Sequence, residues 1–150
     1  MRIVIDSDCN GHELKKILVE SLRGWGHEVA DLDYSSAHPD SNYPDVALNL
    51  GRKIQAGEFP KGVLICGTGL GMAITANKLK GVYAGACEGV FAAERLAKSN
   101  NAQIITLGAQ VTGSESAKMI VKAFVESEFQ GGRSLPKVTR IREIENEVGR

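Results

Sequence analysis

The sequence predicts an α/β protein in which helices cover both faces of a parallel sheet of five strands. Short apolar runs rich in β-branched residues alternate along the chain with longer segments whose apolar residues recur at helical spacing. This alternation indicates βαβ units, whose strands pair in parallel. The 150 residues contain no repeat and no domain boundary, so we expect a single domain over 1–150.

The strands are expected where the apolar runs are short and bounded by turn residues, at 2–6, 28–33, 62–66, 82–87 and 103–107. A polar turn at 7–11 ends the first strand. The fourth consists mostly of small residues, and Asn100 and Asn101 separate the fifth from the preceding helix. Each strand is therefore bounded on sequence grounds alone.

Apolar residues that recur every three or four positions predict helices over 14–25, 43–54, 73–78, 91–99, 113–125 and 138–148. Gly24 and Gly26 end the first helix, and Pro44 is tolerated in the first turn of the second. The loop 34–42 is longer than most strand–helix connections, and loops of this kind often carry function. A second loop, at 130–134, precedes the charged last helix.

Composition excludes several classes of protein. The formal net charge is zero, which argues against a nucleic acid or a membrane surface as partner. No apolar run approaches the roughly 18–20 residues of a membrane span, and the apolar run at residues 1–6 is too short for a signal peptide. Three cysteines are too few, and odd in number, for a disulfide scaffold, so we expect a cytoplasmic protein with reduced thiols.

The motif that carries chemistry is Cys66-Gly67-Thr68-Gly69-Leu70-Gly71, where the third strand ends. Glycines allow backbone N–H groups to turn toward an anion without a Cβ in the way, and a thiolate beside a helix N-terminus is available as base or nucleophile. The spacing G-x-G-x-G differs from the dinucleotide motif G-x-G-x-x-G. We therefore expect a cradle for a phosphate or a developing oxyanion, with a structural turn or a nucleotide site as alternatives.

Other polar residues follow strand ends and should share an edge of the sheet with this motif, because ligands bind at the carboxyl ends of parallel strands. They are Asp6, Asp8 and Cys9 after the first strand, and Cys87 and Glu88 after the fourth. The three cysteines lack C-x-x-C spacing, so no metal is expected. Arg133 and Lys137 suit phosphate binding, although Arg140 and Arg142 follow and the whole segment could be a solvated basic one.

The chain closely resembles the ribose-5-phosphate isomerase B / galactose-6-phosphate isomerase family. The matching segments are Asp8, 43–44, 66–78, 99–102, 107–109, 117–118 and 131–133. The resemblance covers essentially the whole chain and implies a flavodoxin-like or Rossmann-like three-layer α/β/α sandwich. It also implies isomerisation between aldose and ketose sugar phosphates without metal or cofactor. The expected assembly is a homodimer or a dimer of dimers whose active sites are shared between subunits, with the helix at about 138–148 packed on the partner.

The same resemblance implies roles for individual residues. Cys66 would be the base that moves a proton between C1 and C2, and Thr68 would assist at the sugar oxygens. The enediolate would be held by an oxyanion hole of backbone amides at Gly67, Gly69, Leu70 and Gly71. The substrate would contact Asp8, Cys9, Tyr43, Ser99 and Asn100, and its phosphate would bind Arg133 and Lys137. General chemistry supports these roles. A proton on the carbon next to a carbonyl is acidic enough to be removed only if preorganised hydrogen-bond donors stabilise the resulting oxyanion.

Departures from the family pattern bear on the substrate. Cys9, Ser99 and Ser134 replace histidines, and Gln110 and Lys137 replace arginines. In the pentose enzymes the histidine before the asparagine opens the furanose ring, and Ser99 cannot act as a base without a partner that activates it.

A tetrose 4-phosphate cannot close a five-membered ring, so the sequence favours a tetrose/tetrulose 4-phosphate, of the erythrose 4-phosphate type, as substrate. The run Ser-Asn-Asn-Ala-Gln-Ile-Ile-Thr at 99–106 also resembles the tetrose/tetrulose-4-phosphate isomerase branch of this family. The alternatives are a ribose-5-phosphate/ribulose-5-phosphate isomerase and a non-catalytic sugar-phosphate-binding or partner subunit.

Overall fold

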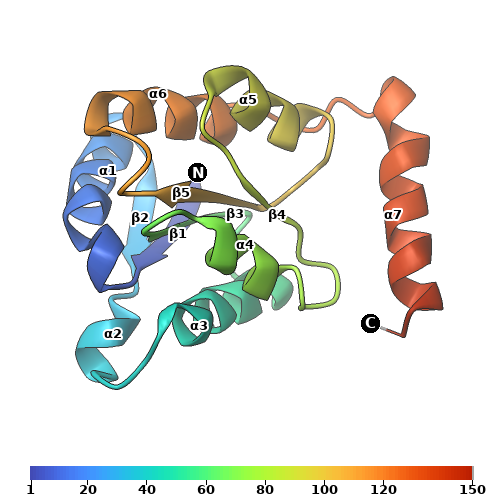
Figure 1. Cartoon of the computed structure of the whole chain (residues 1–150). Helices are drawn as coiled ribbons and strands as arrows, with labels where there is room; N and C mark the ends of the chain where they lie inside the picture. Colours follow the sequence, from blue (N-terminus) through green and yellow to red (C-terminus); the bar gives the residue numbers. More distant parts are fainter. Residues whose placement is uncertain (150) are drawn as a thin grey trace.

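A computed structural model describes residues 1–149 and contains a five-stranded, all-parallel sheet with the strand order β2-β1-β3-β5-β4 (Figure 1). Its strands are β1 (Arg2–Ser7), β2 (Glu28–Asp31), β3 (Lys61–Cys66), β4 (Ala84–Ala86) and β5 (Ile104–Gly108). The predicted fold class is confirmed. The order of the last two strands differs from the flavodoxin order 2-1-3-4-5, since β5 lies between β3 and β4.

Helices cover both faces of this sheet (Figure 1). They are α1 (His12–Gly24), α2 (Tyr34–Ala37), α3 (Tyr43–Gln55), α4 (Leu70–Ala76), α5 (Val90–Lys98), α6 (Ser114–Val125) and α7 (Leu135–Glu147), with 3-10 turns η1 (Cys9–Gly11) and η2 (Gly132–Ser134). Helices α1, α5 and α6 cover one face, and α3 and α4 cover the other. Two apolar cores result, one on each side of the sheet.

Alternation along the strands supplies both cores. Val63 and Ile65 of β3 belong to the core under α1, α5 and α6, whereas Leu64 and Cys66 belong to the core under α3 and α4. All six residues of β3 are buried, as expected of a central parallel strand, whose two faces are both covered. The position of Cys66 is thus fixed by a rigid, fully buried element.

Several boundaries differ from those predicted. Helix α4 begins at Leu70 rather than at residue 73, because Gly69 adopts a positive φ of 82° and turns the chain directly into the helix. Helix α7 begins at Leu135 rather than at 138, with Pro136 in its first turn, where proline is tolerated. The short helix α2 lies within the segment predicted to be a loop.

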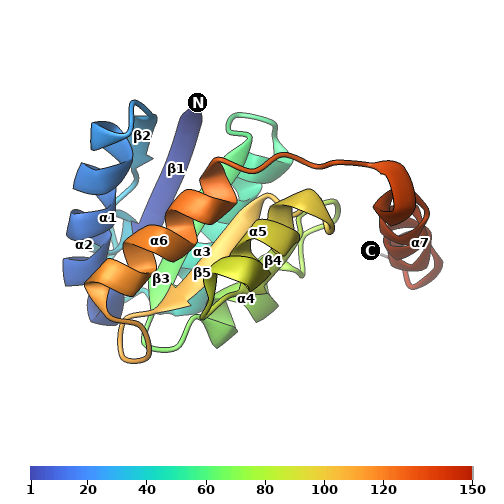
Figure 2. The same cartoon turned by 90° about the horizontal axis from the view of Figure 1, so that it is seen from above.

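Helix α7 stands apart from the sandwich, at the end of an extended connection (Figure 2). Its carboxylate Glu145 accepts hydrogen bonds from the Gly81 amide at 3.0 Å and from the Tyr83 hydroxyl at 2.9 Å. Apolar side chains on this helix and at its C-cap remain exposed: Leu135, Ile141, Ile144 and Val148. That α7 packs on a partner subunit stays a prediction. Among the described residues, no helix has the length and apolar character needed to cross a membrane.

Candidate active site

The glycine motif forms a tight loop between β3 and α4 that packs against the backbone at the end of β5. A Cβ on Gly69 would lie 2.9 Å from the carbonyl carbon of Leu107, and a Cβ on Gly108 would lie 2.5 Å from the Cα of Thr68. The buried hydroxyl of Thr106 donates to the carbonyl of Gly69 at 2.7 Å. Glycine is required at these positions because the loop and the end of β5 approach to backbone contact.

Within the loop, backbone amides already face the two side chains predicted to be catalytic. The Gly69 amide donates to Cys66 Sγ at 3.1 Å, and the Leu70 amide donates to Thr68 Oγ1 at 3.3 Å. The amides of Gly67 and Gly71 have no hydrogen-bond partner among residues 1–149. Of the four amides predicted to form the oxyanion hole, two are therefore engaged by side chains and two are free.

The turn after β1 lies against the same end of β3. The Asp8 amide donates to the carbonyl of Ile65 at 3.2 Å, and the Asp8 carboxylate accepts from the Gly11 amide at 3.1 Å. A Cβ on Gly11 would lie 2.6 Å from the Ile65 oxygen, so this turn also depends on glycine for close approach. Asp8 and Cys9 therefore share an edge with Cys66, as their positions after strand ends predicted.

Tyr43, in the first turn of α3, reaches the glycine loop. A Cβ on Gly71 would lie 2.3 Å from Cε2 of its ring, which places the ring directly against the loop. A cavity of about 490 Å³ adjoins this residue. It is lined by Asp8, Cys9, Asn10, Ser35, Pro39, Ser41, Asn42 and Tyr43. The loop 34–42, flagged for its length, thus supplies part of the wall.

A buried lysine holds the turn that carries Asp8. Lys15 Nζ lies 2.8 Å from Asp31 Oδ1, 3.3 Å from Asp33 Oδ1 and 3.7 Å from Asp6 Oδ1. Burial raises the pKa of the Asp6 carboxyl, and the hydrogen bonds and charges around it offset this only in part. For Lys15 burial acts against the charged form, but the hydrogen bond and charge of Asp31, followed by Asp6, raise its pKa overall.

Asp6 connects this lysine to two segments of the site. One of its oxygens accepts from the Ser7 amide at 2.8 Å, and the other accepts from the Tyr34 amide at 3.2 Å. Ser7 leads into Asp8, and Tyr34 begins α2. The ion cluster therefore links the turn after β1 to the 34–42 segment.

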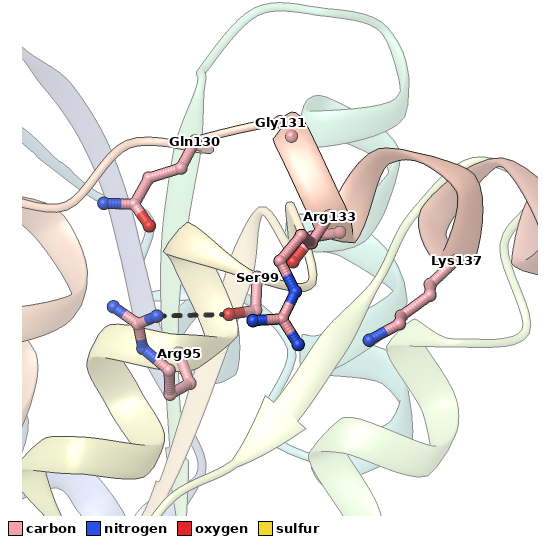
Figure 3. A pocket seen from close by; sticks show the side chains of 8 residues that line it. Arg95, Ser99, Gln130, Gly131, Arg133 and Lys137 are labelled. Atoms are coloured by element: carbon pink, nitrogen blue, oxygen red, sulfur yellow. Dashed lines mark hydrogen bonds between the residues drawn. The ribbon is translucent and has the colours of Figure 1, made fainter.

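The remaining predicted site residues gather elsewhere, around a cavity of about 450 Å³ (Figure 3). It is lined by Arg95, Ser99, Gln130, Gly131, Gly132, Arg133, Ser134 and Lys137. The Gln130 amide donates to the carbonyl of Lys98 at 3.1 Å, which fixes the loop at 130–134 beside the end of α5. Asn100 follows Ser99 and is exposed.

The residues around Cys66 and the residues around Ser99 lie at opposite ends of the strands, at the carboxyl and amino ends respectively. Cys66 pairs with Gly108, at the carboxyl end of β5, whereas Ser99 and Asn100 precede Ile104, at its amino end. With a rise of about 3.3 Å per residue, β5 separates these two ends by roughly 13 Å or more. Within one chain, therefore, Asp8 and Asn100 do not lie beside each other.

Sequence reasoning missed Arg95 and Lys15, although each left a signal. Arg95 lies four residues before Ser99 and so shares its helix face. Lys15 occupies an apolar-face position of α1 between Leu14 and Leu18, where a charge needs a buried partner. Gln110, which replaces an arginine of the family pattern, also reaches the glycine loop. Its side-chain oxygen lies 3.1 Å from the position that a Cβ on Gly67 would take.

The three cysteines are free thiols. Burial raises the pKa of the Cys87 thiol. Over residues 1–149 no group of three or more His, Cys, Asp or Glu side chains is arranged to hold a metal ion.

Comparison with known proteins identifies the family. The family model for Ribose/Galactose Isomerase matches residues 3–141. D-erythrulose-4-phosphate isomerase of Pectobacterium atrosepticum is 43% identical over 141 residues, which cover 94% of this chain and 93% of that protein. Ribose-5-P isomerase B of Listeria innocua is 39% identical, with 97% of both chains covered. The structure of ribose-5-phosphate isomerase B from Clostridium thermocellum has a TM-score of 0.90 at 36% identity and covers 99% of this chain and 100% of that one.

The fold and these matches define a sugar-phosphate isomerase, an enzyme that interconverts aldoses and ketoses. The chain belongs to the ribose/galactose isomerase family. The resemblance and the enzyme class predicted from the sequence are both confirmed.

Proposed function

We propose that the protein interconverts a tetrose 4-phosphate of the erythrose type and the corresponding tetrulose 4-phosphate. The observation that carries this proposal is the composition of the cavity at Ser99. Among residues 1–149 no His, Cys, Asp or Glu of the same chain lines this cavity, and the Ser99 hydroxyl accepts a hydrogen bond from the Arg95 guanidinium, so no base of its own chain activates Ser99. A cyclic sugar phosphate needs a base to open its ring, whereas an open-chain tetrose 4-phosphate needs none. The 43% identical relative, which acts on erythrulose 4-phosphate by name, supports the same substrate.

In the proposed mechanism Cys66, as thiolate, takes a proton from the carbon next to the carbonyl. The carbonyl oxygen becomes the enediolate oxyanion, and the proton returns to the neighbouring carbon. The hydrogen bond from the Gly69 amide holds Cys66 Sγ at the glycine loop. The free amides of Gly67 and Gly71 provide donors for the oxyanion. Thr68, whose hydroxyl is held by the Leu70 amide, carries the proton between the two sugar oxygens.

We further propose that the active site is shared between two chains of a homodimer, or of a dimer of dimers. The separation of Cys66 from Ser99 and Arg133 across the sheet supports this arrangement. The exposed apolar side chains of α7 supply a surface for a partner chain. In this arrangement Cys66, Thr68, Asp8, Cys9 and Tyr43 of one chain act on a sugar whose phosphate is bound by the other.

The substrate is tested by measuring kcat/KM for erythrose 4-phosphate, erythrulose 4-phosphate and ribose 5-phosphate side by side. The tetrose and tetrulose phosphates should be converted far faster than the pentose phosphate. A faster turnover of ribose 5-phosphate would overturn the substrate and support the pentose isomerase. No turnover of any sugar phosphate would support a non-catalytic binding subunit.

The base is tested with Cys66→Ala, which should lower kcat by several orders of magnitude with an unchanged circular dichroism spectrum. Cys87→Ala is the matched control, because Cys87 is a buried thiol at the same sheet edge and outside the glycine loop. It should retain nearly full activity. A Cys66→Ala variant with a near-normal rate would remove Cys66 from the mechanism.

Subunit sharing is tested by mixing Cys66→Ala, which lacks the base, with Arg133→Ala, which binds substrate weakly, after reversible unfolding, and by assaying the mixture at a substrate concentration where each variant alone is nearly inactive. In a mixed dimer one site carries both substitutions and the other carries neither, so about a quarter of the wild-type rate should return. No recovery would show that Cys66 and Arg133 of the same chain serve one site.

A further inference from the structure

Arg95 is a third cation beside the two residues predicted to bind phosphate. It projects from α5 toward Ser99, and Arg133 and Lys137 approach the same space from the segment after α6 (Figure 3). All three line the cavity of about 450 Å³. Its other lining residues, within the described part of the chain, carry no negative charge. The cavity thus concentrates three positive charges.

The hydrogen bonds of Arg95 leave much of its guanidinium unused. One terminal nitrogen donates to Ser99 Oγ over 3.4 Å, and the other donates to Glu94 Oε1 at 2.8 Å. The Nε atom is buried and has no partner among residues 1–149. A guanidinium has five N–H donors in a planar fork that matches phosphate oxygens. Each terminal nitrogen carries two N–H groups and uses one of them in these bonds, so Arg95 retains donors for an anionic ligand.

Glu94 does not neutralise this cluster. It pairs with Arg95 at 2.8 Å and with Lys98 at 3.3 Å, so its single negative charge is divided between two cations of α5. Within residues 1–149, Arg133 and Lys137 form no ion pair. Three like charges around one cavity repel each other unless an anion is bound between them. A doubly charged phosphate satisfies this requirement better than a singly charged group.

We propose that Arg95 is a third phosphate-binding residue, which binds the substrate phosphate together with Arg133 and Lys137. Its contact to Ser99 adds a second function. Because Ser99 Oγ accepts from the Arg95 guanidinium, the hydroxyl proton of Ser99 is free to donate to the same ligand. This proposal rests on the proposed function only in naming the substrate phosphate as the ligand.

The test compares Arg95→Ala and Arg95→Lys with the matched control Lys98→Ala. Lys98 lies on the same helix and contacts the same Glu94, but it does not line the cavity. The Kd for inorganic phosphate is measured by calorimetry, and KM and kcat are measured with erythrulose 4-phosphate. Arg95→Ala should raise both Kd and KM about 10-fold or more, with kcat changed much less, since it removes a charge-assisted contact. Arg95→Lys should recover part of the loss, and Lys98→Ala should stay within about 2-fold of wild type.

Two outcomes separate this inference from the proposed function. If Arg133→Ala weakens phosphate binding and Arg95→Ala behaves like Lys98→Ala, the role of Arg95 is refuted while the isomerase proposal stands. If the protein turns over no tetrose phosphate but Arg95→Ala still weakens inorganic phosphate binding, the substrate is wrong and the anion site remains. An equal rise in Kd for Arg95→Ala and Lys98→Ala would show that Arg95 acts only through its positive charge and does not contact the phosphate. That result would also refute the proposal.

Discussion

Replacing Lys15 with methionine tests how the turn that carries Asp8 is held in place. Methionine keeps most of the apolar stem of lysine and removes the charge from a side chain that is almost completely buried. The substitution leaves the fully buried carboxylate of Asp6 without its cation, with Asp31 and Asp33 still close by. Breaking a buried ion pair by removing one partner costs about 3–5 kcal/mol of unfolding free energy. For a domain of this size that lowers Tm by roughly 6–20 °C.

The loss should depend on pH in a defined direction. Burial raises the pKa of Asp6 above its ordinary value of 3.8, and removal of Lys15 raises it further. Between the unfolded and the folded pKa the native variant binds more protons than the unfolded chain, so its stability falls as pH rises through that window. Each unit of additional pKa shift corresponds to about 1.4 kcal/mol. The pKa of Lys15 is itself raised, so its contribution in the wild type is complete at neutral pH and is lost only above its ordinary value of 10.5.

The unfolding free energy is measured by urea denaturation at pH 5 and pH 7.5. The proteins compared are the wild type, Lys15→Met, the double variant Asp6→Asn/Lys15→Met and Lys16→Met. Lys15→Met should lose more stability at pH 7.5 than at pH 5. The double variant should recover much of the loss, because neither buried charge of the Lys15–Asp6 pair remains. Lys16→Met is the control, since Lys16 is exposed and pairs with the exposed Glu13 on the same helix. A loss below about 1 kcal/mol, or one independent of pH, would refute the reasoning.

Two other substitutions test how the structure supports the glycine loop and the far end of α6. Thr106→Val removes the hydroxyl that donates to the carbonyl of Gly69 and leaves that carbonyl buried without its partner. It should cost about 1–3 kcal/mol and lower kcat, measured by urea denaturation and initial rates, while an unchanged kcat would show that the loop does not depend on this contact. Lys61→Met removes an ammonium that donates to the carbonyls of Phe124 and Ser127 at the end of α6. It should cost about 2–4 kcal/mol with KM unchanged, and a variant as stable as wild type would show that water replaces the amine at these carbonyls.

The sequence predicted the sheet well because the pattern of apolar residues in a strand indicates whether one or both of its faces are buried. The run at 62–66 consists of apolar residues without alternation, and β3 is indeed the central strand with both faces covered. Boundaries were less accurate where a single backbone angle decides them. The start of α4 depends on the positive φ of Gly69, which composition alone permits but does not require.

Part of the candidate site was predictable for the same reason. Asp8 and Cys66 follow strands that pair in parallel, so both had to lie at one sheet edge. The family resemblance implied that Tyr43 contacts the substrate, and the structure places its ring against Gly71 of the glycine loop. Ser99 lies at the other end of the strands, because it precedes β5 along the chain, whereas Asp8 and Cys66 follow or end their strands.

By itself, the sequence determined the family, the class of fold and the glycine loop with its thiol, because these depend on local pattern and on residue identity at fixed spacing. Only the tertiary structure decided which groups meet. It placed Lys15 among three carboxylates, brought Arg95 into the cavity with Arg133, and separated that cavity from Cys66 by the length of β5. These relations join residues far apart along the chain. Packing of the two cores on the sheet fixes them, and no local pattern records that packing.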